Sequence, residues 1–190
     1  MVVYVADSNF LITAHRTTYP LDIATGFWNK VQQLANAGTI ISIDKVKGEL
    51  FDKNDTLEAW CRANLPQGFF KSTVDVMVEY GRVTTWAMSK SDHYLQNALN
   101  EFLNADEADA FVIAYCLADP TNRIVVTQET SEPNRRNKVK IPDCCEALLP
   151  QSSDDFPPPS APSSRRTTLS ASFMTLTCML PSPRWSKQMA

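Results

Sequence analysis

The residues whose types could do chemistry are four carboxylates spread widely along the chain. Two of them follow apolar, strand-like runs and two lie on helical segments: Asp7, Glu129, Glu49 and Asp109. Oxygen ligands of this kind suit Mg²⁺ or Mn²⁺, which keep several waters and bind phosphate oxygens. In phosphodiester hydrolysis such ions activate a water molecule and stabilise charge on the attacking and leaving oxygens. The four acids are therefore candidate ligands of a divalent-metal site.

Asp109 is the most constrained of the four. It lies in the segment 104–118, which opens with carboxylates and continues as an almost unbroken apolar run. A helix that is apolar all round is buried. An unpaired carboxylate on such a helix costs several kcal/mol, roughly, unless it meets a cation, accepts strong hydrogen bonds or becomes protonated. No Lys or Arg lies on this segment, so a bound metal ion is one way to satisfy Asp109.

Simpler roles remain open for several of these acids. Asp7 can serve as the N-cap of the helix that follows it. Glu49 lies beside an apolar helix face, where a solvated surface glutamate is the ordinary interpretation. Asp106 lies one helical turn before Asp109, which puts both on one helix face, so Asp106 either takes part in the site or only places charge at the helix N-terminus.

The elements that must position these residues alternate between strand and helix, which favours an α/β fold with parallel strands. Strands are expected over residues 2–6, 39–43, 123–127 and 139–141. Helices are expected over residues 9–15, 23–36, 45–51, 56–64, 72–88, 91–104, 104–118 and 144–149. The apolar residues of 56–104, Val74 and Met77 included, are expected mostly in the core. Ligands of open parallel sheets bind beyond the carboxyl ends of the strands, so the four acids are expected at one edge.

Other chemistries lack their residues. The five glycines are too scattered for a dinucleotide-binding or phosphate-cradling loop. The two histidines, His15 and His93, are far apart, which argues against a zinc site and against a Ser-His-Asp triad. Five cysteines, an odd number, do not resemble a disulfide framework, and a cytoplasmic location is the simpler expectation. No stretch approaches the length of a membrane span, so no membrane partner is expected.

The chain divides into two parts by composition. Residues 151–190 contain six of the twelve prolines and nine serines, which predicts a poorly folded tail after a domain formed by residues 1–150. The tail carries two Asp and four Arg or Lys residues, a net charge of +2. Because the whole chain has a net charge of −3, residues 1–150 carry −5. An acidic domain argues against broad nonspecific binding to polyanions but allows a local basic patch. Within the tail, residues 169–180 could form a short amphipathic helix.

The order of these motifs resembles the PIN domain, the PilT N-terminus nuclease fold. The likeness is carried by Asp7-Ser8-Asn9 after a strand, by Glu49 on the next helix, by 109–114, and by 125–127 followed by an acid. It covers about residues 1–150 and implies a three-layer α/β/α sandwich with a mainly parallel sheet of four to five strands. It also implies an Mg²⁺- or Mn²⁺-dependent endoribonuclease in which Asp7, Glu49 and Asp109 bind the metal and Glu129 takes the place of the fourth acid.

Many proteins of that family are toxins of toxin–antitoxin pairs, the VapC-like proteins. The resemblance therefore implies an RNA substrate and an antitoxin protein as partner, with a homodimer left open. One departure is that the fourth acid of the family is usually aspartate, whereas Glu129 is one methylene longer. A basic loop follows it, and its side chains are candidates for RNA phosphate contacts: Arg135, Arg136, Lys138 and Lys140.

Two rival functions stay open. A degenerate PIN scaffold used only for binding is favoured by the departure at Glu129. A haloacid-dehalogenase-like phosphatase would use Asp7 as nucleophile, but that chemistry wants a second aspartate two residues on, where this chain has Asn9. The RNA target, the identity of an antitoxin and the role of the tail do not follow from the sequence.

Overall fold

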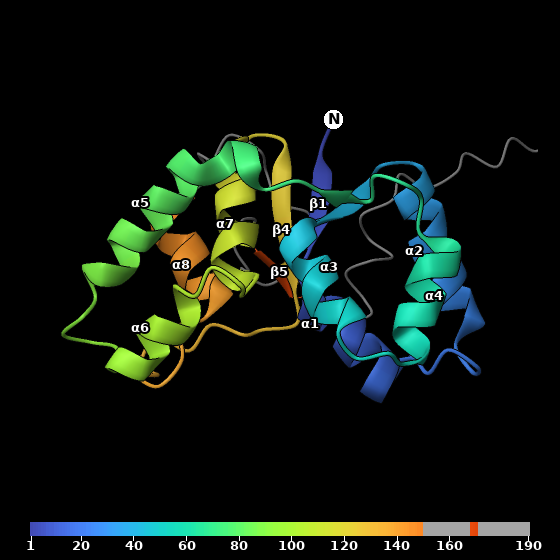
Figure 1. Cartoon of the computed structure of the whole chain (residues 1–190), viewed down its shortest axis with the longest axis horizontal. Coiled ribbons are helices and arrows are strands. Elements are labelled where there is room, and N and C mark those ends of the chain that lie inside the picture. Colours follow the sequence, from blue (N-terminus) through green and yellow to red (C-terminus); the bar gives the residue numbers. More distant parts are fainter. Residues whose placement is uncertain (150–167, 171–190) are drawn as a thin grey trace, which may run out of the picture.

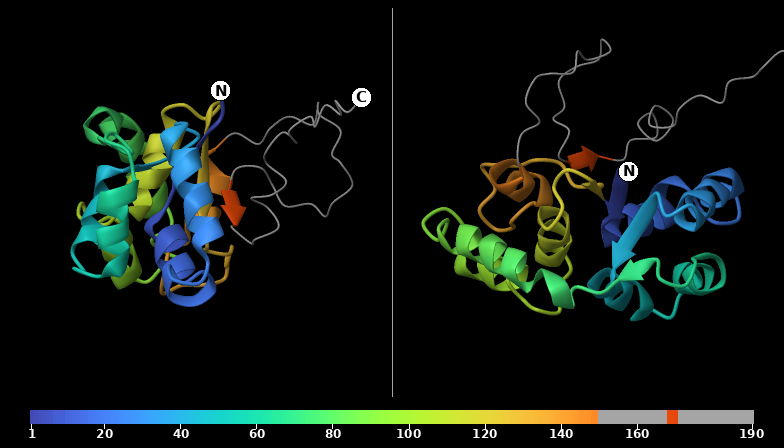
Figure 2. Two further views of the ribbon diagram at one scale, coloured as in Figure 1. Left: turned by 90° about the vertical axis from the view of Figure 1, so that its right-hand side faces the viewer. Right: turned by 90° about the horizontal axis from the view of Figure 1, so that it is seen from above.

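The protein is described here by a computed structural model, which covers residues 1–149 and 168–170 (Figure 1). Its centre is a five-stranded sheet in the order β3-β2-β1-β4-β5, and every neighbouring pair of strands is parallel. The strands are β1 (Val3–Ala6), β2 (Ile40–Ile43), β3 (Phe70–Lys71), β4 (Arg123–Thr127) and β5 (Thr168–Ser170). Helices lie on both sides of the sheet (Figure 2), so the three-layer α/β/α fold is confirmed.

Eight α-helices surround the sheet within the described residues. They are α1 (Ser8–Thr13), α2 (Thr25–Asn36), α3 (Asp44–Phe51), α4 (Thr56–Asn64), α5 (Met77–Met88), α6 (Gln96–Phe102), α7 (Asp109–Leu117) and α8 (Ile141–Leu148). A π-helical turn, η1 (Ala14–Thr18), extends α1, and a 3₁₀ turn, η2 (Val74–Val76), precedes α5.

Helix α7 is the central helix of the fold. Every residue that follows Asp109 in it is buried, and it packs on β4, β1 and β2 while α5 packs against it. The predicted buried helix is thus confirmed, but it begins at Asp109 and not at residue 104. The backbone before it turns, because the Glu107 N–H donates to Asn104 O and the Asp106 N–H donates to Asn104 Oδ1. Asp106 and Asp109 therefore do not share a helix face, and that prediction is wrong.

The structure departs from the sequence-based predictions in three further places, each for a local reason. Residues 139–141 form no strand: Lys140 is the N-cap of α8, and the Ile141 N–H donates to a glutamate side chain. The two-residue strand β3 was not expected, because it is too short to show an alternating pattern. Val74 and Met77, expected in the core, are exposed: Val74 lies in the 3₁₀ turn η2 and Met77 in the first turn of α5, whose buried residues are Val83 and Ala87.

The tail contributes one described segment to the sheet. Strand β5 pairs with β4, with Val125 opposite Thr168 and Thr127 opposite Ser170. The helix expected over residues 169–180 falls on this strand at its first two residues and otherwise lies outside the described residues. No helix in the described part of the chain has both the length and the apolar character needed to cross a membrane.

Candidate active site

Asp7 sits where the ends of β1 and β4 meet. Ala6 pairs with Val126, and the Asp7 N–H continues the ladder by donating to Val126 O at 3.0 Å, so Asp7 lies level with Thr127. The Thr127 hydroxyl donates to Asp7 Oδ2 at 3.0 Å, and the Ser8 hydroxyl approaches Oδ1 at 3.4 Å. Asp7 occupies the N-cap position of α1, yet its side chain makes no capping hydrogen bond. The carboxylate is therefore directed to the strand ends and does not stabilise the helix start.

The pKa values of Asp7 and Asp109 are raised in part by the charges of the other predicted acids. Burial raises the pKa of Asp7 to about 6, a hydrogen bond from Thr127 opposes this, and the charges of Glu49 and Glu129 add to it. Burial also raises the pKa of Asp109 well above 3.8, and the charges of Asp7, Glu129 and Glu49 raise it further against the opposing effect of Lys138. Acids from four separate elements thus act on one another, as expected for one shared site.

Glu49 bridges two of the elements that form this site. It is half-buried on α3, and its Oε1 accepts a hydrogen bond of 2.8 Å from the Ala108 N–H, directly before α7. This bond holds the side chain beside Asp109. The simpler interpretation, a solvated surface glutamate, is therefore wrong for Glu49.

Glu129 is held differently from the other three acids. Its Oε1 lies 3.1 Å from Lys140 Nζ and 3.4 Å from Lys138 Nζ, while its Oε2 accepts a hydrogen bond of 3.1 Å from the Ile141 N–H. The residue is 8% exposed, and the side chain of Lys140 is 12% exposed. Its own N–H donates to the Thr127 hydroxyl, which in turn donates to Asp7. Glu129 is therefore a compensated, buried carboxylate.

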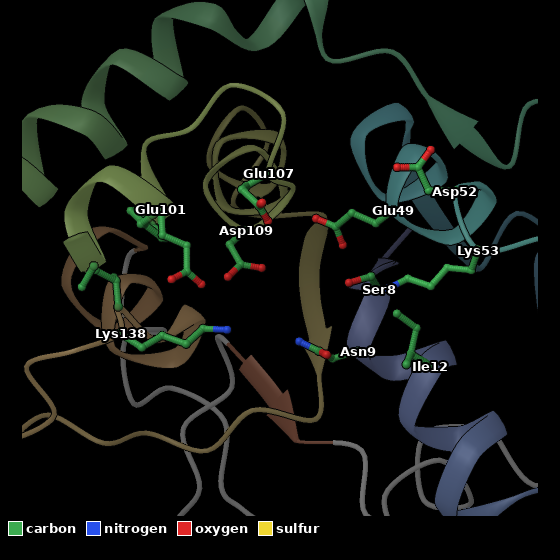
Figure 3. A pocket seen from close by; sticks show the side chains of 13 residues that line it. Ser8, Asn9, Ile12, Glu49, Asp52, Lys53, Glu101, Glu107, Asp109 and Lys138 are labelled. Atoms are coloured by element: carbon green, nitrogen blue, oxygen red, sulfur yellow. The ribbon is translucent and has the colours of Figure 1, made fainter.

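A pocket of about 560 Å³ opens beside these acids (Figure 3). Its wall is mainly acidic, with carboxylates from α3, α6 and the start of α7 and two lysines: Glu49, Asp52, Glu101, Glu107, Asp109, Lys53 and Lys138. Ser8 and Asn9 of α1 line it as well, next to the fully buried Asp7. The carboxylates of Glu49, Glu107 and Asp109 all point into this space in Figure 3.

The basic loop does not present its four predicted side chains equally. Lys138 lines the pocket. Lys140 is buried against Glu129, Arg135 pairs with Glu132 at 3.0 Å, and the Arg136 Nε donates to His93 O at 2.9 Å. Among the four residues expected to contact RNA phosphates, Lys138 is the one that faces the acidic pocket.

The carboxylate oxygens of the site are ligands of the kind that a hard divalent cation prefers, but their arrangement fits such an ion less well. Among residues 1–149 and 168–170, no three His, Cys, Asp or Glu side chains are grouped so that they could hold a metal ion. Glu129 is neutralised by lysines, and one oxygen of Glu49 is engaged by a backbone N–H. Asp7 and Asp109, however, have no salt bridge within the described residues, although burial disfavours the charge of both and the charge of Asp7 further disfavours that of Asp109. A cation between them would relieve that repulsion.

Several residues of the site were not predicted from the sequence. Glu101 and Glu107 line the pocket, whereas Asp106, which was considered, is exposed outside it. Thr127 joins Asp7 to Glu129 through its hydroxyl. Its position as the last residue of β4 was a usable signal, because two parallel strands in register bring their final residues together.

The fold and the pocket define a class: a parallel α/β/α protein with an acidic site at the carboxyl edge of its sheet. Residues 4–153 match the family described as Domain of unknown function (DUF4411), and the chain belongs to that family. Comparison with curated proteins gave no match, and comparison with solved structures gave none either.

Proposed function

We propose that this protein is an Mg²⁺- or Mn²⁺-dependent endoribonuclease of the PIN type. The observation that carries the proposal is the pair Asp7 and Asp109: burial raises the pKa of both, the charge of Asp7 raises the pKa of Asp109 further, and neither has a salt bridge in the described part of the chain. Such a pair is costly to keep charged without a cation. The order of motifs that resembles the PIN domain supports the same reaction class.

Each residue then has a physical role. Asp7 and Asp109 would hold the divalent ion, with Glu49 completing the site through the oxygen that Ala108 does not engage. When bound, such an ion activates a water molecule and stabilises charge on the phosphodiester. Thr127 keeps Asp7 oriented through its 3.0 Å hydrogen bond. Lys138, at the pocket wall, is placed to pair with a backbone phosphate of single-stranded or loop RNA.

The decisive experiment compares two aspartates that lie three residues apart. Asp109→Asn should lower Mn²⁺-dependent cleavage of a labelled single-stranded RNA by roughly two orders of magnitude or more, because a ligand of the ion is lost. Asp106→Asn is the matched control, since Asp106 is exposed and does not line the pocket, and it should cleave as the unsubstituted chain does. Circular dichroism should show the same fold for all three proteins. Equal cleavage by the Asp109 variant and its control would disprove the proposal.

The proposal extends to a toxin that an antitoxin holds in check, and this part rests on the resemblance alone. Expression of the unsubstituted chain should then arrest growth, and expression of the Asp109→Asn variant should not. Growth arrest by both proteins would separate toxicity from cleavage and would contradict the toxin assignment.

A binding scaffold without catalysis is the second candidate. Two observations favour it. The described residues contain no group of three side chains that could hold a metal ion, and Glu129 forms ion pairs with two lysines. Calorimetric titration with Mn²⁺ separates the candidates, because a scaffold should release no binding heat. The phosphatase alternative is weaker, because Asn9 stands where that chemistry needs a second aspartate.

A further inference from the structure

Lys138 brings a positive charge into the acidic pocket from the loop that follows β4. Its Nζ lies 3.4 Å from Glu129 Oε1, and its side chain lines the pocket together with Asp109. In Figure 3 its ammonium group points into the pocket, on the side of the Asp109 carboxylate. Burial raises the pKa of Asp109, and the charge of Lys138 acts against that rise, so the two groups lie within electrostatic reach of each other. The chain itself therefore supplies one cation to this side of the pocket.

Glu129 does not need this second lysine. Its Oε1 accepts a hydrogen bond of 3.1 Å from Lys140 Nζ, and its Oε2 accepts one of 3.1 Å from a backbone N–H. Glu132, which lies 3.7 Å from Lys140 Nζ, has its own partner in Arg135 at 3.0 Å. Lys140 thus balances the charge of Glu129, and the charge of Lys138 is in surplus. The side chain of Lys138 is 32% exposed against 12% for Lys140, so the surplus charge faces the pocket.

The backbone that carries Lys138 is held on both sides. Before it, the Leu95 N–H donates to Arg136 O at 2.8 Å, and the Arg136 Nε donates to His93 O at 2.9 Å. After it, Val139 is 1% exposed and packs in the core. Because both neighbouring segments are anchored, the ammonium group of Lys138 is kept at the pocket wall.

One divalent ion and this lysine would balance the charges at the centre of the site. Asp7, Glu49 and Asp109 carry three negative charges when all are ionised, and the remaining acids of the pocket wall are exposed to water, which weakens their effect. Two divalent ions beside Lys138 would leave an excess of positive charge. In sites with two ions, the ions lie about 3.5–4 Å apart and stabilise the attacking and leaving oxygens. Glu129, the acid on the side of Lys138, is already paired with lysines and is not free to hold a second ion.

We propose that the ammonium group of Lys138 takes the place of a second divalent ion, so that the site binds one ion and Lys138 supplies the other positive charge. This inference rests on the proposed nuclease function. In hydrolysis the oxygen of water bonds to phosphorus, the bond from phosphorus to the leaving oxygen breaks, and a proton from water passes to the leaving oxygen. Lys138 forms no covalent bond in this step. Its charge stabilises the negative charge that develops on the phosphate oxygens.

The first experiment counts the Mn²⁺ ions bound to the full-length protein by calorimetric titration without RNA. The unsubstituted chain should bind one ion. Lys138→Met should bind Mn²⁺ about threefold to tenfold more tightly, because a fixed positive charge near the ion no longer repels it. Lys90→Met is the matched control, since Lys90 is exposed, lies outside the pocket and should leave the dissociation constant unchanged. Two ions per unsubstituted chain, or a Lys138→Met variant that binds Mn²⁺ no more tightly than its control, overturns the inference.

The second experiment measures RNA cleavage by the same proteins at saturating Mn²⁺. Lys138→Met should lower kcat by about a hundredfold, because a charge directed at the reacting phosphate is lost. Lys138→Arg keeps the charge and should retain most of kcat. Tighter Mn²⁺ binding together with slower cleavage distinguishes this role from a structural one, because a distorted site would lose both. An unchanged kcat in Lys138→Met overturns the inference.

Failure of this inference can be told apart from failure of the proposed function. If Asp109→Asn abolishes Mn²⁺ binding and cleavage while Lys138→Met changes neither, the nuclease assignment stands and the role given to Lys138 is wrong. If the unsubstituted chain binds no Mn²⁺ and cleaves no RNA, both are wrong.

Discussion

The acidic cluster has two halves that solve the same electrostatic problem differently. Glu129 is buried with Lys140 at 3.1 Å, Lys138 at 3.4 Å and a backbone N–H on its second oxygen. Asp7 is fully buried beside the Thr127 and Ser8 hydroxyls, whereas Asp109 lines the pocket, where Lys138 partly offsets the neighbouring acids. Neither aspartate has a salt bridge within the described residues. The comparison distinguishes Glu129, whose buried charge is neutralised by lysines, from Asp7 and Asp109, whose charges are unfavourable in the folded protein. Residues kept at such a cost are candidates for function.

The difference arises from chain connectivity. The loop after β4 returns to the sheet edge only nine and eleven residues beyond Glu129, carrying Lys138 and Lys140 with it. The segments that follow Asp7 and Asp109 are helices, and the residues nearest to these acids in sequence bring no cation back to them. Four predictions test this contrast.

The largest change in the free energy of unfolding is expected around Glu129, whose buried charge is neutralised by lysines. Lys140→Met should lower the free energy of unfolding by about 3 kcal/mol, because it leaves the charge of Glu129 buried with one partly exposed lysine. Urea denaturation followed by circular dichroism measures this. Arg135→Gln is the control, since Arg135 pairs with Glu132 at the surface and should cost less than about 1 kcal/mol. Equal losses in the two variants would show that Glu129 needs no buried partner.

Removing the charge of Asp7, which has no salt bridge among the described residues, should instead raise the free energy of unfolding at pH 7. An acid with a raised pKa in the folded state binds its proton more tightly when folded, so its contribution to stability is present below pH 3.8 and is lost as the pH rises through about 6. For Asp7 the loss amounts to roughly 3 kcal/mol or less, since the charges of its neighbours share the effect. Asp7→Asn should therefore be more stable than the unsubstituted chain at pH 7 without metal, and the difference should vanish near pH 4. Denaturation at both pH values checks this, and a variant less stable at pH 7 would contradict it.

Added metal should stabilise the folded protein by binding at Asp7 and Asp109. Mn²⁺ at about 100 times its dissociation constant should stabilise the folded protein by about 2.7 kcal/mol, and EDTA should reverse the gain. A thermal melt monitored by intrinsic fluorescence measures both steps. Asp109→Asn should lose this response while Asp106→Asn keeps it. A rise in Tm that survives in the Asp109 variant would place the ion elsewhere.

The smallest stability effect belongs to Lys138. Lys138→Gln should cost less than about 1 kcal/mol, because its side chain is partly exposed and Lys140 still pairs with Glu129. Its effect should appear in RNA binding, where the loss of one phosphate contact lowers the slope of log affinity against log salt by about 0.7 for single strands. Fluorescence anisotropy over a series of salt concentrations measures that slope. An unchanged slope would remove Lys138 from the RNA-contacting surface.

Much of the candidate site followed from local patterns. The apolar run after Asp109 required a buried helix, and the runs before Asp7 and Glu129 required buried strands whose ends meet at one edge. The compensation of Glu129 could not be predicted, because it needs the 138–140 segment to fold back as the cap of α8 and not as a strand. The hydrogen bond from Ala108 to Glu49 joins residues 59 apart, and no spacing rule reports such a contact.

The sequence by itself determined the alternation of strands and helices, the buried helix α7 and the identity of the four acids, because periodicity and apolar runs act over a few neighbouring residues. Only the tertiary structure decided which acids are neutralised and which are not. Burial, register and returning loops set the distance from each carboxylate to a cation, and these are properties of the packed chain. For the same reason Val74 and Met77, expected in the core as apolar residues, are found at the surface.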